Sequence, residues 1–129
     1  ADFPSDALLT PVPLSLERMN ERGFNQAELL ARSLGRRRGL PVETRMLVRT
    51  RATRPQVGLN AVERHRNIAG AFALASQAGQ IYSPIILIDD VCTTGATLSA
   101  CADALQQGMA RQVWAYTLTR AAFADAEIP

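Results

Sequence analysis

Apolar and polar residues along the chain follow two different spacings, and each spacing predicts one kind of element. Short apolar runs bounded by proline, glycine or polar residues are typical of strands. Such runs fall at 7–14, 43–50, 72–74, 83–89 and 112–119. Longer stretches with apolar residues three and four apart indicate helices. These fall at 25–35, 60–70 and 96–108. Strands alternating with helices predict an α/β fold: an open, mostly parallel twisted sheet with flanking helices.

Polar residues and glycines predict where the helices begin and end. An Asn cap followed by a Glu three residues later starts a helix, and a Gly ends it. Two helices carry these signals: Asn25, Glu28 and Gly35 in the first, and Asn60, Glu63 and Gly70 in the second. In the third, the helical spacing places four residues inward: Leu98, Cys101, Ala104 and Leu105.

Two stretches differ most in polarity. In residues 83–89, SPIILID, the stretch between Ser83 and the final acid is continuously apolar. A run that is apolar on both faces is typical of the centre of a parallel sheet. Residues 51–60 are polar and Arg-rich and contain Pro55 and Gly58. They predict a long exposed loop, and loops of this length are often functional.

Composition narrows the class of protein without identifying its function. The chain has 129 residues, of which 47% are hydrophobic and 20% charged, which fits one globular domain. All 14 basic residues are Arg, and 12 of them lie within 17–66 beside 5 acidic residues. This imbalance favours an anionic ligand, although a solvated surface explains any single Arg equally well.

The same composition gives expectations about the protein's surroundings. No apolar run approaches the roughly 18 residues of a membrane span. The start of the chain lacks the basic and then apolar pattern of a signal peptide. Cys92 and Cys101 lack the spacing of a redox pair or of a zinc site. We therefore expect a cytoplasmic protein with two free thiols and no membrane partner.

The stretch ILIDDVCTTGAT, residues 86–97, carries the clearest chemical signal. Ligands of open α/β sheets bind beyond the carboxyl ends of the strands, and Asp89 and Asp90 fall at such an end. Two adjacent carboxylates persist there most easily when ligand hydroxyls, a hydrated metal or an Arg donates to them. The turn that follows suits a phosphate monoester because it combines backbone N–H groups at a helix start with hydroxyls and a glycine. Its residues are Thr93, Thr94, Gly95, Ala96 and Thr97. A ribose 5-phosphate lying across the strand end fits this pattern; a capped helix after an ordinary strand is the alternative.

These residues resemble the phosphoribosyl pyrophosphate (PRPP) motif of type I phosphoribosyltransferases. That motif is a hydrophobic strand, two acids, a variable pair and then Thr-Thr-Gly-Ala-Thr. The resemblance implies that Asp89 and Asp90 are the catalytic residues and hold the ribose 2- and 3-hydroxyls. It also implies that Thr93 to Thr97 bind the 5-phosphate.

A second stretch narrows the resemblance to the competence protein ComF family, which includes GntX-like proteins. Residues 11–32, PVPLSLERMNERGFNQAELLAR, are similar to the first strand end and the following helix of that family. In the wider fold the loop between this strand and helix contacts pyrophosphate. The resemblance therefore assigns pyrophosphate binding to Arg18, Arg22 and Gly23.

A third stretch, 49–72, is similar to the family's segment that closes over the substrate. The resemblance places Arg49, Thr53 and Gln56 in a flexible loop with that role. ComF relatives usually begin with a cysteine-rich zinc-binding segment, which this chain does not contain. Residues 1–129 are thus expected to be the phosphoribosyltransferase-like domain.

The resemblance implies PRPP or ribose 5-phosphate as the ligand. Mg²⁺ would be held through pyrophosphate and waters, with no direct protein ligand. Transfer of the phosphoribosyl group to an acceptor would follow, and the sequence does not identify the acceptor. The alternative is an accessory protein of DNA uptake that binds single-stranded DNA and keeps a non-catalytic or regulatory PRPP pocket. Aromatic residues make up only 5% of the chain, which weighs against base stacking. A homodimer is compatible with both interpretations.

Overall fold

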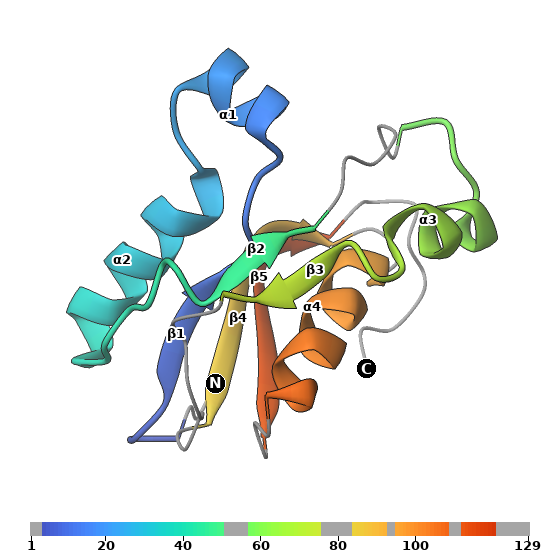
Figure 1. Ribbon diagram of the computed structural model, residues 1–129. Helices are drawn as coiled ribbons and strands as arrows, with labels where there is room; N and C mark the ends of the chain where they lie inside the picture. The colour runs from blue at the N-terminus through green and yellow to red at the C-terminus, as the bar shows by residue number, and fades with distance from the viewer. Residues whose placement is uncertain (1–3, 51–56, 76–83, 93–94, 109–111, 121–129) are drawn as a thin grey trace.

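The chain forms an α/β structure, shown in Figure 1. The computed structural model describes residues 4–50, 57–75, 84–92, 95–108 and 112–120. The strands are β1 (Leu8–Pro11), β2 (Leu47–Arg49), β3 (Phe72–Leu74), β4 (Ile85–Cys92) and β5 (Val113–Arg120). The helices are α1 (Leu16–Arg22), α2 (Gln26–Arg38), α3 (Ala61–Ile68) and α4 (Ala96–Gln107).

β4 is the centre of a three-stranded parallel sheet with the order β1-β4-β5. Leu9 of β1 pairs with Ile86 of β4, and β5 pairs with the other edge of β4. The predicted fold class, a mostly parallel sheet with flanking helices, is confirmed. The strand predicted at 83–89 continues to Cys92, because its pairing with β5 extends as far as Arg120.

Helices cover both faces of β4, with α2 on one side and α4 on the other (Figure 1). The four residues Ile85 to Ile88 are at most 1% exposed, as expected for a central strand. Burying each such side chain contributes about 1.5–3 kcal/mol. The predicted inward set on α4 is confirmed, since all four of its members are buried: Leu98, Cys101, Ala104 and Leu105.

A separate two-stranded antiparallel sheet is formed by β2 and β3, with Arg49 opposite Phe72. The short strand predicted at 72–74 is confirmed, whereas the strand predicted at 43–50 is reduced to its last part. The reason is that the start of this stretch lies beside β1 instead of β3: Glu43 N donates a hydrogen bond to Leu9 O at 2.8 Å. The chain then leaves β1 and pairs with β3, which lies against α4.

α2 extends three residues beyond its predicted end. Gly35 does not end the helix, which continues to Arg38 and is ended by Gly39 with φ +67°. Gly35 instead lies against the next part of the chain. A Cβ at this position would be 2.7 Å from Val42 Cγ2 and 2.8 Å from Leu40 O. The glycine is required by this close approach rather than by a turn.

The helix starts agree with the sequence in most respects. The Asn25 side chain caps α2 by accepting a backbone hydrogen bond at 3.0 Å. Glu28, predicted as the second half of a capping box, pairs with Arg32 at 3.3 Å instead. α3 has the complete predicted capping box, because Asn60 and Glu63 exchange side-chain to backbone hydrogen bonds of 2.8 and 3.0 Å.

Candidate functional site

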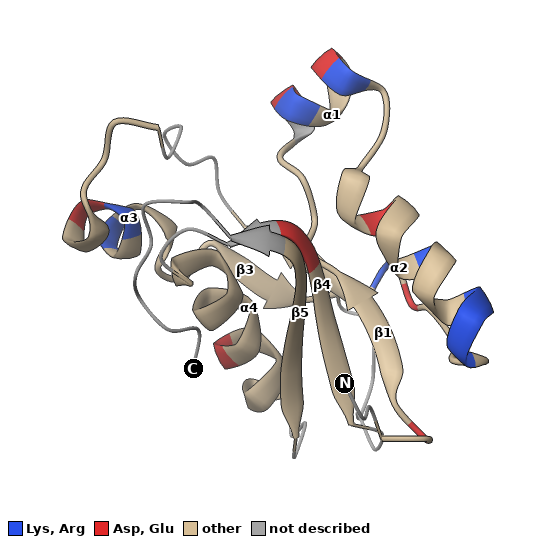
Figure 2. Ribbon diagram, turned by 180° about the vertical axis from the view of Figure 1, so that it is seen from behind, with Lys and Arg blue, Asp and Glu red and all other residues tan. Residues whose placement is uncertain are grey.

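The carboxyl end of β4 carries the two predicted acidic residues, and Figure 2 shows this acidic strand end at the edge of the sheet nearest α1. Asp89 and Asp90 lie within the strand, and both are half-buried. Because neighbouring strand residues point to opposite faces, Asp89 shares the α4 face of Leu87 while Asp90 lies on the α2 face. Asp89 Oδ1 accepts a hydrogen bond from Asp90 N at 2.9 Å. The two carboxylates therefore belong to neighbouring residues at the end of one strand, on opposite faces of the sheet.

Burial controls the ionisation of Asp89. Desolvation, together with the Asp90 side chain, raises the pKa of its carboxyl to about 7, while the Asp90 backbone N–H and the Arg49 guanidinium oppose the change. Below Asp89, on α4, burial also raises the pKa of the Cys101 thiol, which is fully buried. Cys101 is therefore a neutral packing residue, and Asp89 is a carboxyl group whose charge depends on its neighbours.

The start of α4 follows this strand end and differs from the starts of the other described helices. Those three have a side-chain N-cap, whereas α4 starts after Gly95, which has no side chain and has φ +81°. A helix start presents backbone N–H groups and partial positive charge. Of the remaining residues of the predicted phosphate turn, Ala96 is buried and Thr97 half-buried. Thr93 and Thr94 lie outside the described residues.

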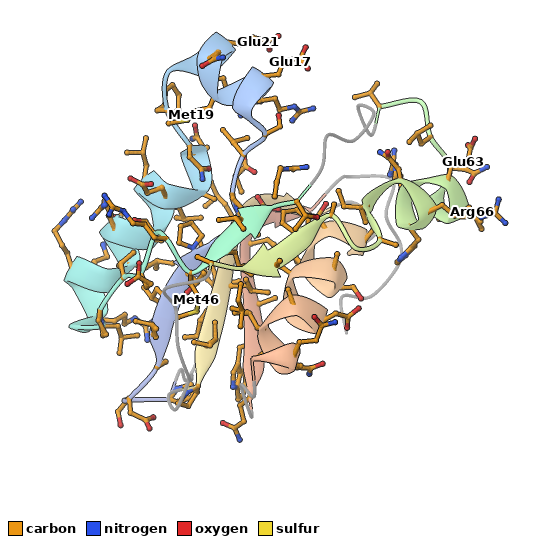
Figure 3. The ribbon with its side chains drawn as sticks, viewed as in Figure 1. Glu17, Met19, Glu21, Met46, Glu63 and Arg66 are labelled. Atoms are coloured by element: carbon orange, nitrogen blue, oxygen red, sulfur yellow. The ribbon has the colours of Figure 1, made fainter. Side chains whose placement is uncertain are left out.

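The segment predicted as a pyrophosphate-binding loop is a helix, α1, which Gly23 ends with φ +76°. Its sequence has the usual helix signals: a Ser N-cap, an acid in the first turn and a terminal Gly. Arg18 and Arg22 lie one turn apart and are exposed, on a helix that stands above the carboxyl end of the sheet (Figure 2). Glu17 and Glu21 project from the part of α1 farthest from the sheet (Figure 3).

Arg49, which the resemblance assigned to a flexible loop, is anchored in β2 and half-buried. Its Nε donates to Pro13 O at 3.3 Å, and its guanidinium carbon lies 4.9 Å from the centre of the Phe72 ring. The other two residues assigned to that loop, Thr53 and Gln56, lie outside the described residues. Arg49 also lies near enough to Asp89 for the charge of each group to act on the pKa of the other.

Sequence reasoning missed a groove of about 180 Å³ between α3 and α4. Its polar lining includes His65, Ser99 and Asp103, and it reaches the first residue of α4, Ala96. The sequence feature that indicates this groove is the series of small residues at every third or fourth position of α4. His65, to which the sequence assigned no role, lies at this groove.

Two further observations concern metals and membranes. Within the described part of the chain, no three His, Cys, Asp or Glu residues are grouped so that they could hold a metal ion. In the same part of the chain, no helix has the length and apolar character that crossing a membrane requires.

A scan for protein families finds no model that matches the chain. Individual proteins do match it. Competence protein F of Haemophilus influenzae is 36% identical over 114 residues, 88% of this chain and 50% of that protein. Competence protein ComFC of Bacillus subtilis is 38% identical over 114 residues, 88% of this chain and 44% of that protein. DNA utilization protein YhgH of Salmonella typhi is 35% identical over 118 residues, 92% of this chain and 51% of that protein.

The fold and the acidic strand end define an open α/β protein with two carboxylates at the edge of the sheet where such folds usually bind their ligands. The identities to these relatives, sustained over most of the chain, support its assignment to the ComF family of competence proteins. The chain spans about half the length of the relatives it matches.

Proposed function

We propose that this chain is a phosphoribosyltransferase-like domain that binds PRPP or ribose 5-phosphate at the carboxyl end of β4. One observation carries the proposal: a pair of half-buried carboxylates and a helix start with a glycine at its N-cap follow each other at the end of the central strand. Carboxylates accept hydrogen bonds from hydroxyls, and a helix start binds phosphate. A ribose 5-phosphate presents both groups a few ångströms apart.

The sugar end of this site depends on charge. Ionised Asp89 and Asp90 can each accept hydrogen bonds from the ribose 2- and 3-hydroxyls, and these hydroxyls would offset the cost of placing two carboxylates together. The phosphate end would use backbone N–H groups at Gly95 and in the first turn of α4. Glycine suits this position because a side chain at φ +81° would be strained, and its lack of a side chain would let a phosphate approach the backbone closely.

Transfer of the phosphoribosyl group would use the cations above the sheet. The bond from ribose C1 to pyrophosphate oxygen breaks, the electron pair leaves with pyrophosphate, and C1 forms a bond to the acceptor. Positive charge develops on the ribose ring, as in glycoside cleavage, and the strand-end carboxylates would stabilise it. Arg18 and Arg22, together with Mg²⁺ bound through pyrophosphate and waters, would stabilise the leaving group.

Thermal unfolding with and without ligand tests this proposal. PRPP with Mg²⁺ at 100 times its Kd should stabilise the fold by about 2.7 kcal/mol, because the ligand binds only the folded chain. Ribose 5-phosphate should also stabilise it, and ribose alone much less. No shift with millimolar PRPP and Mg²⁺ would contradict the proposal. Release of pyrophosphate in the presence of a panel of bases and amines would then test transfer and identify the acceptor.

The names of the relatives favour a second function, binding of single-stranded DNA, because they include competence and DNA utilization proteins. The exposed run Arg36 to Arg38 in the last turn of α2, with Arg18 and Arg22, could contact phosphates. The test is binding of labelled single-stranded DNA at several salt concentrations. Affinity that falls steeply as salt rises supports this function; binding that is absent at low salt excludes it.

A further inference from the structure

Residues 13–24 leave the parallel sheet after β1 and return to it at the start of α2. They include α1, a helix of seven residues. The described side chains of α1, Glu17 to Arg22, are all exposed, and Figure 1 shows α1 standing apart from the sheet. A helix this short is marginal by itself, and these side chains bury no face that could hold it in place. The position of α1 is therefore set by the two ends of the segment.

The first end of the segment is fixed beside the end of β4. Val12 is buried, and its N–H donates to Ile88 O at 2.9 Å, immediately before Asp89. The prolines on either side of Val12 restrict rotation of the backbone there. The next carbonyl, Pro13 O, accepts a hydrogen bond from Arg49 Nε at 3.3 Å. The segment therefore starts from a rigid point next to the acidic pair.

The second end is fixed by the side chain of Asn25, which makes two hydrogen bonds. Its Oδ1 accepts from Ala27 N at 3.0 Å and so caps α2. Its Nδ2 donates to Val12 O at 3.0 Å. An amide suits both bonds because it contains an acceptor and a donor, whereas the carboxylate of an Asp N-cap has only acceptors. One side chain thus closes the segment at its base and joins it, through Val12, to β4.

This closure decides where the cations of α1 stand. Arg18 and Arg22 are exposed, and Figure 2 shows α1 above the carboxyl end of the sheet. Burial lowers the pKa of the Arg49 guanidinium, and the charge of Arg18 also lowers it, so these two groups lie near enough to interact. Because arginine side chains are long and flexible, the fold can fix only the helix that carries them. A helix free to turn about its base would spread its charges over a wide volume.

We propose that Asn25 is a positioning residue: by its hydrogen bond to Val12 O it holds α1 over the end of β4, so that Arg18 and Arg22 meet the pyrophosphate of PRPP. The purpose of this arrangement rests on the proposed PRPP site, whereas its physical content, that Asn25 fixes α1, does not. A ligand without pyrophosphate gains little from a fixed α1. Substitution of Asn25 should therefore affect PRPP and ribose 5-phosphate differently, which loss of an ordinary helix cap would not do.

Backbone ¹⁵N relaxation of the ligand-free chain tests the physical content. In the unsubstituted chain the amides of α1 should have order parameters near about 0.85, the value of a rigid backbone. Asn25→Asp keeps the cap acceptor but loses the amide donor, and Asn25→Ser keeps a cap with a shorter side chain and no added charge. In both variants the order parameters of α1 should fall below about 0.6, while those of α2 beyond its first turn stay unchanged. Gln26→Glu, which adds the same charge at the adjacent exposed position, should leave α1 rigid.

Calorimetric titration with PRPP and Mg²⁺, and separately with ribose 5-phosphate, tests the purpose. If α1 is in place about a tenth of the time in the Asn25 variants, PRPP should bind them about tenfold more weakly. Ribose 5-phosphate should bind them as it binds the unsubstituted chain. Gln26→Glu should keep the ratio of the two affinities. The titrations are made at a temperature at which every variant is folded, so that a change in stability does not enter the comparison.

The outcomes separate the two proposals. A mobile α1 in the Asn25 variants of a chain that binds neither ligand supports the role of Asn25 and removes the proposed function. Unchanged order parameters, or an α1 that is already mobile in the unsubstituted chain, overturn the inference, and normal binding of both ligands then keeps the proposed function. An equal loss for PRPP and ribose 5-phosphate overturns the role in pyrophosphate binding. If Asn25→Asp does not fold, Asn25→Ser decides between these outcomes.

Discussion

The parallel sheet and the β2–β3 pair differ in what holds them together. At the centre of the sheet, four consecutive residues of β4 are at most 1% exposed and are packed from both sides by helices. Each strand of the β2–β3 pair has three residues, Val48 is 42% exposed, and one contact between the strands is a guanidinium over a ring. This chain thus divides its roles: buried apolar residues hold the sheet together, and the smaller elements α1 and β2 carry the cations Arg18, Arg22 and Arg49.

The largest effect on ligand binding is expected from the two carboxylates at the end of β4. The Asp89→Asn, Asp90→Asn double variant keeps the shape of the strand end but removes both carboxylates. Ligand stabilisation of about 2.7 kcal/mol at 100 times the Kd of the unsubstituted chain should be lost, as measured by thermal unfolding with PRPP and Mg²⁺. Asp103→Asn, which removes an exposed carboxylate on α4, is the control and should respond normally.

The same double variant also separates the two functions. Its binding of single-stranded DNA, if the unsubstituted chain shows it, should be unchanged, because the acids do not attract phosphates. A double variant that still responds fully to PRPP would mean that the sugar lies elsewhere.

A change within the scaffold should alter stability and not binding. Gly35→Ala places a methyl group 2.7 Å from Val42 Cγ2 and 2.8 Å from Leu40 O, and such overpacking costs typically about 1–3 kcal/mol. Urea unfolding measures the loss. Ser33→Ala, two residues earlier on α2, is the control. An Ala that stabilises the fold, as in an ordinary helix interior, would contradict the tight packing of α2 against this part of the chain.

A change among the exposed cations should alter binding and not stability. Arg18→Ala with Arg22→Ala should weaken PRPP binding by about tenfold, which corresponds to about 1.4 kcal/mol. Binding of ribose 5-phosphate, which has no pyrophosphate, should hardly change. Calorimetric titration with both ligands measures this difference.

Arg36→Ala with Arg37→Ala is the matched control for net charge, since these residues lie at the far end of α2. An equal loss for both ligands, or an equal loss in the control pair, would show that α1 contributes only general attraction.

The sequence predicted the scaffold well because apolar burial leaves a strong pattern. The run from Ile85 to Ile88 indicated a central strand, and the spacing of Leu98 and Leu105 indicated the buried side of α4; both are confirmed. Gly35 shows the limit of such signals. A glycine ends some helices, but here it permits a contact with Val42 that no local pattern reveals.

The charged region was predicted less completely. The sequence of α1 contains helix signals, but the family resemblance identified this segment as a loop. The helix was therefore not predicted. Arg49 could not be placed from sequence at all, because its contacts with Pro13 and Phe72 join residues that are more than 20 positions apart. Local sequence patterns predict helices and strands. The position of a charged side chain such as Arg49 depends on which helices and strands pack together, and local patterns do not show this.

The central claim is that a sugar phosphate binds where β4 ends and α4 begins. The most direct measurement is an amide NMR titration of the isotope-labelled chain with ribose 5-phosphate. We expect saturable shifts of the Gly95 and Ala96 amides, together with Asp89 and Asp90, and their loss in the double Asn variant. Shifts confined to α2, or to the groove between α3 and α4, would contradict the claim.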